Sequence, residues 1–291
     1  MEKNVSNLIV ASRKTNYLNN ISLENYRSNK IYLEEEYADI TDLDMYNEAI
    51  VAVSKSELFF VDIQNETILD KLETGITAEK IKIYRDDAFI LSSYSNSLIV
   101  YDLVEKEVKI VYKINDYPCS IELDKEEGRI YITSFLGGTI QIFDCINYVQ
   151  VNQINNLNYP TKAVISEDSR YIFVIESYCT LYGNGVLSIF DKKSLTKINT
   201  IKIGKIPSDL VQIDNILAIS NFDDSVINII DLVNYRVTFF YICGMINRLV
   251  RRNDDIICSD YSLGTIKILD FKHNKEKIIA KANTPSAMIV V

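Results

Sequence analysis

The stretch that decides the fold runs from Arg129 to Asp144. It begins Arg129-Ile130-Tyr131-Ile132-Thr133-Ser134, continues through Gly137-Gly138-Thr139-Ile140 and closes on Asp144. Both apolar runs are short and rich in β-branched and aromatic residues, and turn residues separate them, which is typical of neighbouring β-strands. This stretch therefore predicts two short strands joined by a tight turn, the second ending in an acid.

The same phrase recurs along the chain: an apolar run, Ser or Asn, a polar gap, a second apolar run, then an acid. Ile50 to Ser54 leads to Asp62, Phe89 to Ser93 leads to Asp102, and a weaker first copy runs from Leu8 to Glu24. The closing acids lie 38 to 47 residues apart, at positions 24, 62, 102, 144, 191, 231 and 270. A period of about 40 residues with several short strand-like runs per unit indicates the blades of a propeller.

Prolines repeat this spacing. Pro118, Pro160 and Pro207 each follow their acid by 16 residues, and Pro285 follows Asp270 by 15. We therefore expect an all-β, seven-bladed β-propeller of four-stranded antiparallel blades, with residues 1–291 forming a single propeller domain. In each unit the first strand follows the proline position, the second ends in Ser or its equivalent, the third ends in the acid and the fourth comes after it.

The two ends of the chain predict how the ring closes. The sequence begins with a second strand at residues 8–11 and ends with a surplus first strand at residues 287–291. Pairing these strands would complete the N-terminal blade and remove an open sheet edge. We therefore expect the C-terminal strand to join the N-terminal blade.

Two segments resemble the YVTN repeat of bacterial seven-bladed, WD-repeat-like propellers. They are residues 129–144 and Pro160-Thr161-Lys162-Ala163-Val164-Ile165-Ser166-Glu167-Asp168. Most copies in this chain lack the Asn that the family places after Thr. The resemblance implies the fold but no single function, because related propellers include secreted surface proteins, cofactor-binding domains, and lyases or lactonases.

The composition of the chain excludes some classes of partner and indicates a cellular location. The net charge of −9 argues against nucleic acid, whose phosphates are met by clustered Lys and Arg. Five scattered cysteines predict reduced thiols, and no signal peptide or bilayer-spanning run is evident, so we expect a cytoplasmic protein with no membrane insertion. The Ile-, Asn- and Lys-rich usage is typical of an AT-rich bacterial genome.

The repeat separates structural from functional residues. An acid that is present in every unit is expected to have a structural role in the blade. We therefore expect the six aspartates and Glu24 to accept backbone N–H bonds in turns. The single histidine, His273, is expected in an exposed turn. Without several histidines or a nucleophile or phosphate motif, the sequence predicts no catalytic residue, metal or cofactor.

Aromatic residues recur after the second strand of each unit and predict a partner-binding set on one mouth of the channel. Its members are Tyr94, Phe135, Tyr178, Phe222 and Tyr261, joined by Tyr182 in the longest loop, residues 176–185. The alternative interpretation is that these rings pack between blades. The longest loop has a neutral interpretation too, as an insertion that propeller loops tolerate.

A charged set is expected at the start of the innermost strands. Two residues after each proline position stand Asp42, Lys80, Ser120, Lys162, Asp209, Arg248 and Ala287. Asp42, Lys80, Lys162, Asp209 and Arg248 form a candidate ligand ring around the channel mouth. Either it is a mutually neutralising, water-filled ring, or its cations bind a small anion or an acidic peptide.

Two functions remain open. The first is a non-enzymatic binding scaffold that presents one propeller face to a protein or peptide partner. The alternative is a small-molecule lactonase or lyase that uses carboxylates and a divalent cation at the channel mouth. Oxygen ligands for such a cation would come from Asp42, Asp44, Glu122 and Asp209.

Overall fold

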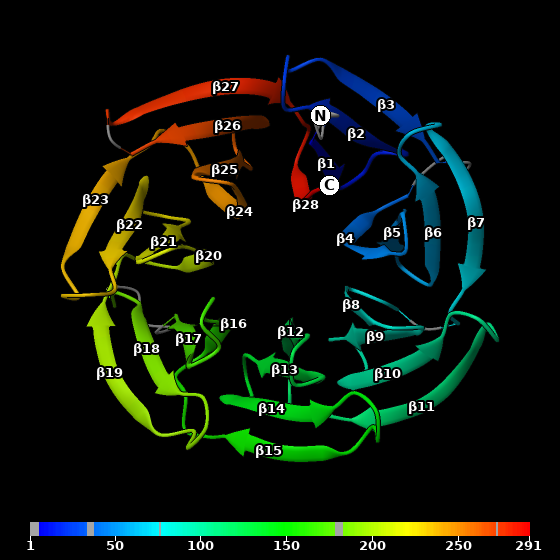
Figure 1. The fold of residues 1–291 in the computed structure, drawn as a ribbon, viewed down its shortest axis with the longest axis horizontal. Coiled ribbons are helices and arrows are strands. Elements are labelled where there is room, and N and C mark those ends of the chain that lie inside the picture. The colour runs from blue at the N-terminus through cyan, green and yellow to red at the C-terminus, as the bar shows by residue number, and fades with distance from the viewer. Residues whose placement is uncertain (1–5, 34–37, 76, 178–182, 272) are drawn as a thin grey trace.

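The computed structural model describes residues 6–33, 38–75, 77–177, 183–271 and 273–291. These residues form 28 strands in seven four-stranded antiparallel sheets and no helix. The sheets are arranged as blades around a central axis (Figure 1). The predicted all-β, seven-bladed propeller is confirmed.

Each blade contributes one innermost first strand. These are β28 (Pro285–Val290), β4 (Ile40–Tyr46), β8 (Lys80–Tyr84), β12 (Pro118–Asp124), β16 (Pro160–Ile165), β20 (Pro207–Ile213) and β24 (Ile246–Arg252), in blades 1 to 7. The second strands are β1 (Asn7–Ser12), β5 (Ala49–Ser54), β9 (Asp87–Ser92), β13 (Arg129–Ser134), β17 (Tyr171–Glu176), β21 (Ile216–Asn221) and β25 (Asp255–Asp260).

The two outer strands of each blade follow in the same order. The third strands are β2 (Tyr17–Ser22), β6 (Glu57–Asp62), β10 (Ser97–Asp102), β14 (Thr139–Asp144), β18 (Val186–Asp191), β22 (Val226–Asp231) and β26 (Thr265–Asp270). The fourth strands are β3 (Ser28–Tyr32), β7 (Thr67–Glu73), β11 (Glu107–Lys113), β15 (Gln150–Ile154), β19 (Lys197–Lys202), β23 (Val237–Tyr241) and β27 (Lys275–Lys281).

The ring closes through blade 1, as the chain ends predict. Strand β28 pairs antiparallel with β1, with Val10 opposite Met288, and completes the sheet β28-β1-β2-β3. Asn7 and Val291 exchange backbone hydrogen bonds of 2.9 Å in both directions. The closing strand begins at Pro285, two residues before the predicted position 287, and Figure 1 shows both chain ends in this blade.

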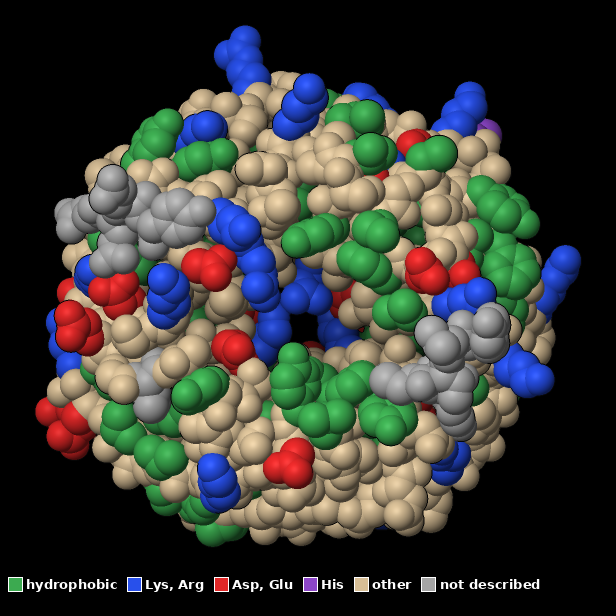
Figure 2. All heavy atoms as spheres, turned by 180° about the vertical axis from the view of Figure 1, so that it is seen from behind, with side chains coloured by type: hydrophobic (Ala, Val, Ile, Leu, Met, Phe, Trp, Pro, Cys, Tyr) green, Lys and Arg blue, Asp and Glu red, His purple; other side chains and the backbone are tan. Residues whose placement is uncertain are grey.

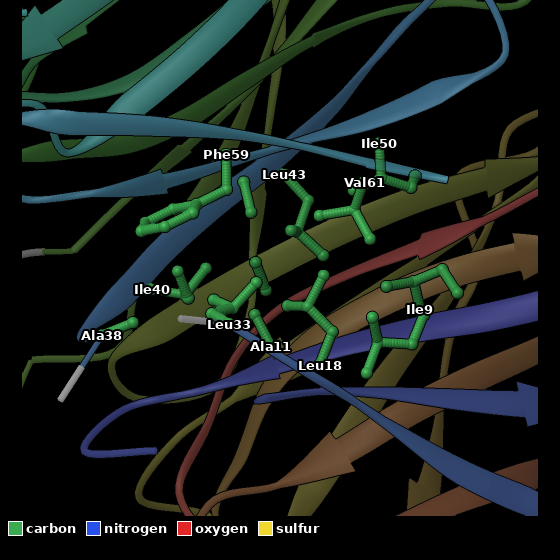
Figure 3. Close-up of a cluster of buried hydrophobic side chains, with 13 residues drawn as sticks. Ile9, Ala11, Leu18, Leu33, Ala38, Ile40, Leu43, Ile50, Phe59 and Val61 are labelled. Atoms are coloured by element: carbon green, nitrogen blue, oxygen red, sulfur yellow. The ribbon is translucent and has the colours of Figure 1, made fainter. Parts of the chain in front are cut away.

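The hydrophobic core is divided among the blade interfaces. Buried apolar side chains of the described residues form seven clusters, one between each pair of neighbouring blades. Figure 3 shows the cluster between blades 1 and 2, where Ile9 and Leu18 meet Leu43, Ile50 and Phe59. Because both faces of the second strands are covered, strands such as β5 and β9 carry unbroken apolar runs rather than an alternating pattern.

The acids that close each repeat stabilise turns. In six blades the third strand ends on the predicted aspartate, whose carboxylate accepts backbone N–H groups two or three residues later. These N–H to carboxylate distances are 2.8, 2.8, 2.8, 2.7, 2.8 and 3.1 Å for Asp62, Asp102, Asp144, Asp191, Asp231 and Asp270. Blade 1 departs from the prediction, because its third strand ends at Ser22 and Glu24 lies two residues beyond the equivalent position.

A second set of hydrogen bonds ties neighbouring first strands together, and we name it the inter-blade belt. The residue after the proline position donates its side chain to the carbonyl at the proline position of the next blade. The bonds are Thr161 Oγ1 to Pro207 O (3.1 Å), Ser208 Oγ to Ile246 O (2.8 Å), Asn247 Nδ2 to Pro285 O (2.7 Å) and Ser286 Oγ to Ile40 O (2.6 Å). The last of these bonds crosses the point where the ring closes.

Deleting residues 285–291 is expected to unfold or aggregate the protein, because β1 would become an unpaired, apolar edge. The melting temperature of the deletion variant and its aggregation are measured by thermal melting with light scattering. A Val10→Cys/Met288→Cys variant provides the matched test, because these residues lie opposite each other, and its melting temperature should rise only when the disulfide forms. Unchanged melting of the deletion variant would contradict the closure.

Replacing Ser286 with Ala is expected to lower the free energy of unfolding by about 1–2 kcal/mol. The change removes the hydroxyl donor from a buried belt position and leaves the Ile40 carbonyl without that bond. Ser286→Thr is the control, since Thr161 makes the same bond in blade 5. Equal denaturant midpoints for the two variants would show that the belt bond contributes nothing.

Candidate functional site

The strand register places the predicted charged ring at one level of the channel. Each of the seven residues pairs with the last but one residue of the second strand of its blade, as Lys80 does with Leu91 and Arg248 with Ser259. Asp42, which lacks a preceding proline, occupies the same position opposite Val53. All seven residues line one cavity of about 190 Å³, which we name the channel cavity.

The carboxylates of the channel are bound to the backbone of the next blade. Asp42 Oδ2 accepts the N–H of Ile81 at 3.1 Å, and Asp209 Oδ2 accepts the N–H of Leu249 at 2.8 Å. These amides lie on first strands, whose free edges face away from their own second strands. The carboxylates therefore pair polar backbone groups that the blade leaves open.

Two carboxylates lower in the channel repeat this arrangement. Asp44 Oδ2 accepts the N–H of Ile83 at 2.6 Å, and Glu122 is hydrogen-bonded by the backbone of Ile165. Burial raises the pKa of Asp44 and of Glu122 above the ordinary carboxyl values. Within the described ranges no group of three or more His, Cys, Asp or Glu side chains could hold a metal ion. Each of the four carboxylates proposed as hard-cation ligands thus already accepts a backbone N–H of the next blade.

The cations of the ring differ in how well they are paired. Lys162 Nζ forms a close ion pair with Asp209. Lys80 Nζ lies 3.9 Å from Asp42 Oδ1 and 3.5 Å from the Thr41 carbonyl, which are loose contacts. Burial lowers the pKa of Lys80 to about 8, with repulsion from Arg248 and Lys162 acting in the same direction and Asp42 opposing them.

Arg248 is held by carbonyl groups rather than by an acid. Its Nε donates to Ser286 O at 2.9 Å and its Nη1 to Asn247 O at 3.3 Å. No carboxylate of the described chain lies within ion-pair distance of it. The guanidinium is therefore positioned but not neutralised.

A second cavity of about 340 Å³ opens above the ring, and we name it the mouth cavity. Arg13, Lys80 and Arg248 line it together with the aromatic rings of Tyr117, Phe222 and Tyr261. Its one carboxylate, that of Glu79, accepts the N–H of Ser93 at 2.9 Å. Figure 2 looks onto this side of the molecule and shows Lys and Arg side chains around a central opening with hydrophobic side chains beside it.

Cys119 lies where the two cavities meet. Its Sγ is 3.4 Å from the Thr161 carbonyl and 3.5 Å from that of Pro160. Burial raises the pKa of this thiol to about 12, so it remains a neutral thiol at physiological pH. Its role in the channel is that of a weak donor.

The predicted aromatic set is only partly gathered at the mouth. Phe222 and Tyr261 line the mouth cavity with ring centroids 6.1 Å apart, and Phe135 packs against Tyr117 and Tyr159. Tyr94 stands one residue later in its loop than Phe135 does and is 88% exposed, while Ser93 lines the cavity instead. Tyr178 and Tyr182 lie outside the described residues.

The structure adds a set that the sequence reading missed. The residue directly before the first strand is large, apolar and exposed in four successive blades: Tyr117, Tyr159, Ile206 and Met245 are 50, 40, 51 and 37% exposed. The first three have left-handed backbones with φ of 57°, 53° and 49°, a conformation that is uncommon for such residues. A large apolar residue stands directly before Pro118, Pro160 and Pro207, and this recurrence in the sequence could have predicted the set.

Together these side chains form a surface that we name the apolar arc, on blades 4 to 7 around the mouth cavity. Its members are Tyr117, Phe135, Leu136, Tyr159, Ile206, Phe222, Met245, Tyr261 and Leu263. Leu136 and Leu263 are 60 and 59% exposed. Exposed apolar side chains gathered in this way mark interaction sites more often than isolated ones do.

His273 lies apart from this face, in the turn after β26. Its Nδ1 is 2.7 Å from Asp270 Oδ2, and its backbone N–H donates to the same carboxylate at 3.1 Å. The side chain is exposed, as predicted. No helix of the described residues is long and apolar enough to cross a membrane.

No family model matches the chain, and no curated protein matches it either. The YVTN resemblance therefore stays a prediction.

Solved structures share the fold. A functionally unknown protein of Desulfotomaculum acetoxidans superimposes with a TM-score of 0.81 at 14% identity, covering 98% of each chain. A candidate 6-phosphogluconolactonase of Bacteroides fragilis gives 0.80 at 12% identity, covering 100% of this chain and 99% of its own. Hydrazine synthase of Kuenenia stuttgartiensis gives 0.74 at 14% identity, covering 82% of this chain and 79% of its own. At such identities the likeness shows a shared propeller fold and nothing about the reaction or ligand.

Proposed function

We propose that this chain is a binding propeller that presents the face bearing the apolar arc to a protein or peptide partner. The observation that carries the proposal is the arc itself, a set of aromatic and aliphatic side chains, all exposed except the half-buried Phe135 and Phe222, beside a cavity with three cations. Aromatic and Arg side chains around a central pocket are the usual anchors of protein recognition.

The position of these side chains supports this proposal. Tyr117 and Tyr159 pack their rings against Phe135, and Ile206 is exposed on the neighbouring blade. Left-handed backbones also occur at Tyr148 and Tyr235, at the opposite end of the blades, so the backbone conformation alone does not mark the face. The support lies in large apolar side chains that are exposed in successive blades beside one cavity.

The catalytic alternative, a lactonase or lyase with a divalent cation, has less support. Asp42, Asp44, Glu122 and Asp209 are each hydrogen-bonded to a backbone amide of the next blade. The candidate lactonases of Bacteroides resemble this chain in fold alone. A clear rise in melting temperature with Ca²⁺, Mg²⁺ or Mn²⁺ would favour the alternative.

We also infer from the sequence that the protein is a YVTN-type propeller of the bacterial cytoplasm, with residues 1–291 as one domain. The repeat phrase and the scattered cysteines support this proposal.

The partner face is tested with a triple variant, Tyr117→Asn/Tyr159→Asn/Ile206→Asn, and a displayed library of random 12-residue peptides. Peptides selected on the natural protein should bind the variant at least 10-fold more weakly, because asparagine keeps the left-handed backbone and removes the apolar contact. Fluorescence anisotropy of labelled peptides measures the affinities.

The matched control is Tyr235→Asn. Tyr235 has φ of 59° and is 41% exposed, but it lies in the turn after β22, at the opposite end of the blades. Its replacement should leave binding unchanged. Equal losses in both variants, or no loss in the triple variant, would contradict the proposed face.

A further inference from the structure

The mouth cavity carries more positive than negative charge. Three cationic side chains, those of Arg13, Lys80 and Arg248, face one carboxylate, that of Glu79. This carboxylate already accepts a hydrogen bond from Ser93. Convergent cations in a concave site with low-dielectric walls create a positive potential, in a protein whose net charge is −9.

Arg248 has the donors that an oxyanion requires. A guanidinium carries five N–H donors, and the two hydrogen bonds of Arg248 use Nε and Nη1. These bonds to Ser286 and Asn247 fix the plane of the group, and Nη2 has no hydrogen-bond partner among the residues that the structure describes. A fixed, uncompensated guanidinium that lines a cavity is suited to bind a carboxylate or a phosphate.

Lys80 is the second group that an anion would satisfy. Around its ammonium stand Asp42 on β4, Cys119 on β12, Lys162 on β16, Asp209 on β20 and Arg248 on β24. Two cations oppose its charge, and the nearest carboxylate oxygen is at 3.9 Å. An anion in the mouth cavity would relieve this crowding and raise the lowered pKa of Lys80.

The walls of the cavity indicate which anion fits. Tyr117, Phe222 and Tyr261 line it together with Pro118 and Pro285, so much of the contact surface is apolar. An inorganic ion would leave these walls facing water, whereas an acidic side chain would place methylene groups against them. The apolar arc extends outward from the same cavity.

We infer that the mouth cavity binds a carboxylate carried on an organic group, namely an acidic side chain of the partner peptide, through Arg248 and Lys80. The inference deepens the proposed function and rests on it for the identity of the carrier. Tyr117, Phe222 and Tyr261 contact the aliphatic part of the side chain, and the arc contacts the residues on either side.

The test uses N-acetyl-glutamate amide as the probe and its neutral isostere N-acetyl-glutamine amide as the matched ligand, with inorganic phosphate as a third arm. Chemical-shift titration of the full chain at pH 7 measures binding. We expect the glutamate probe to bind at least 10-fold more tightly than the glutamine probe and more tightly than phosphate. Equal binding of the two isosteres, or tighter binding of phosphate, would overturn the inference.

Variants assign the effect to the mouth cavity. Arg248→Gln and Lys80→Gln should each weaken the glutamate probe at least 10-fold, and Arg248→Lys should retain part of the affinity. Arg251→Gln is the control on the same strand, because Arg251 binds Glu167 away from the two cavities. If Arg251→Gln weakens the probe as much as Arg248→Gln does, the site is not in the mouth cavity. Thermal melts establish that each variant is folded.

The pH dependence provides an independent readout. Because the pKa of Lys80 is about 8 without ligand, affinity for the glutamate probe should fall as the pH rises from 7 to 9.5. Lys80→Gln should remove most of this fall. A pH-independent affinity of the natural protein would count against Lys80 as a ligand group.

The two experiments distinguish failure of the peptide-binding face from failure of the carboxylate site. If the glutamate probe binds through Arg248 while the arc variants leave peptide binding unchanged, the carboxylate site stands and the peptide partner is rejected. If selected peptides bind through the arc but tolerate replacement of every Asp and Glu by Asn and Gln, the partner face stands and the carboxylate site is rejected.

Discussion

The open edge of the innermost strands is the constraint on which the rest of the structure depends. Seven first strands surround the axis, and each pairs with a second strand along one edge only. The other edge leaves backbone amides and carbonyls that no further strand can satisfy. Side chains must do so instead, and the channel is polar for that reason.

The solution repeats from blade to blade. Asp42 and Asp209 each accept the amide one position further along the next first strand, and Asp44 and Glu122 do the same two residues lower. The inter-blade belt satisfies carbonyls at the upper end, as Ser286 does for Ile40 across the closure. Most charged residues of the channel are therefore explained by the fold. What remains for function is the positive charge of Lys80 and Arg248, which no close carboxylate of the described residues balances.

Much of this was predictable from the sequence because the repeat is local. The period of the acids predicts the number of blades, and the incomplete units at the two chain ends predict that β28 joins β1. The same reasoning places Lys80 and Arg248 at one level of the channel, even though their blades lack the proline.

Hydrogen bonds between neighbouring blades were harder to predict from the sequence. The bond from Asp42 to Ile81 joins residues one repeat apart, and a pattern read within each repeat does not reveal it. The repeat predicts that Glu24 closes the third strand of blade 1, but this strand ends at Ser22, so the spacing of the acids is misleading in this blade. Tyr117 and Ile206 were overlooked because exposure depends on a left-handed turn, which the residue types disfavour.

The channel departs from what folding requires at Lys80, which is only loosely paired with Asp42, and at Arg248, which has no carboxylate partner among the described residues. Ser120 and Ala287 occupy the same level in blades 4 and 1 without any charge, so the architecture accepts a neutral side chain at this position. Keeping Lys80 protonated at neutral pH against a pKa lowered to about 8 destabilises the folded state by an amount on the order of a few kcal/mol at most. The fold gains little in return, since the ammonium makes only long contacts, 3.5 Å to the Thr41 carbonyl and 3.9 Å to Asp42 Oδ1. A charge that is expensive to hold, not required by the blade, and adjacent to an exposed apolar surface is best explained by a ligand that compensates it.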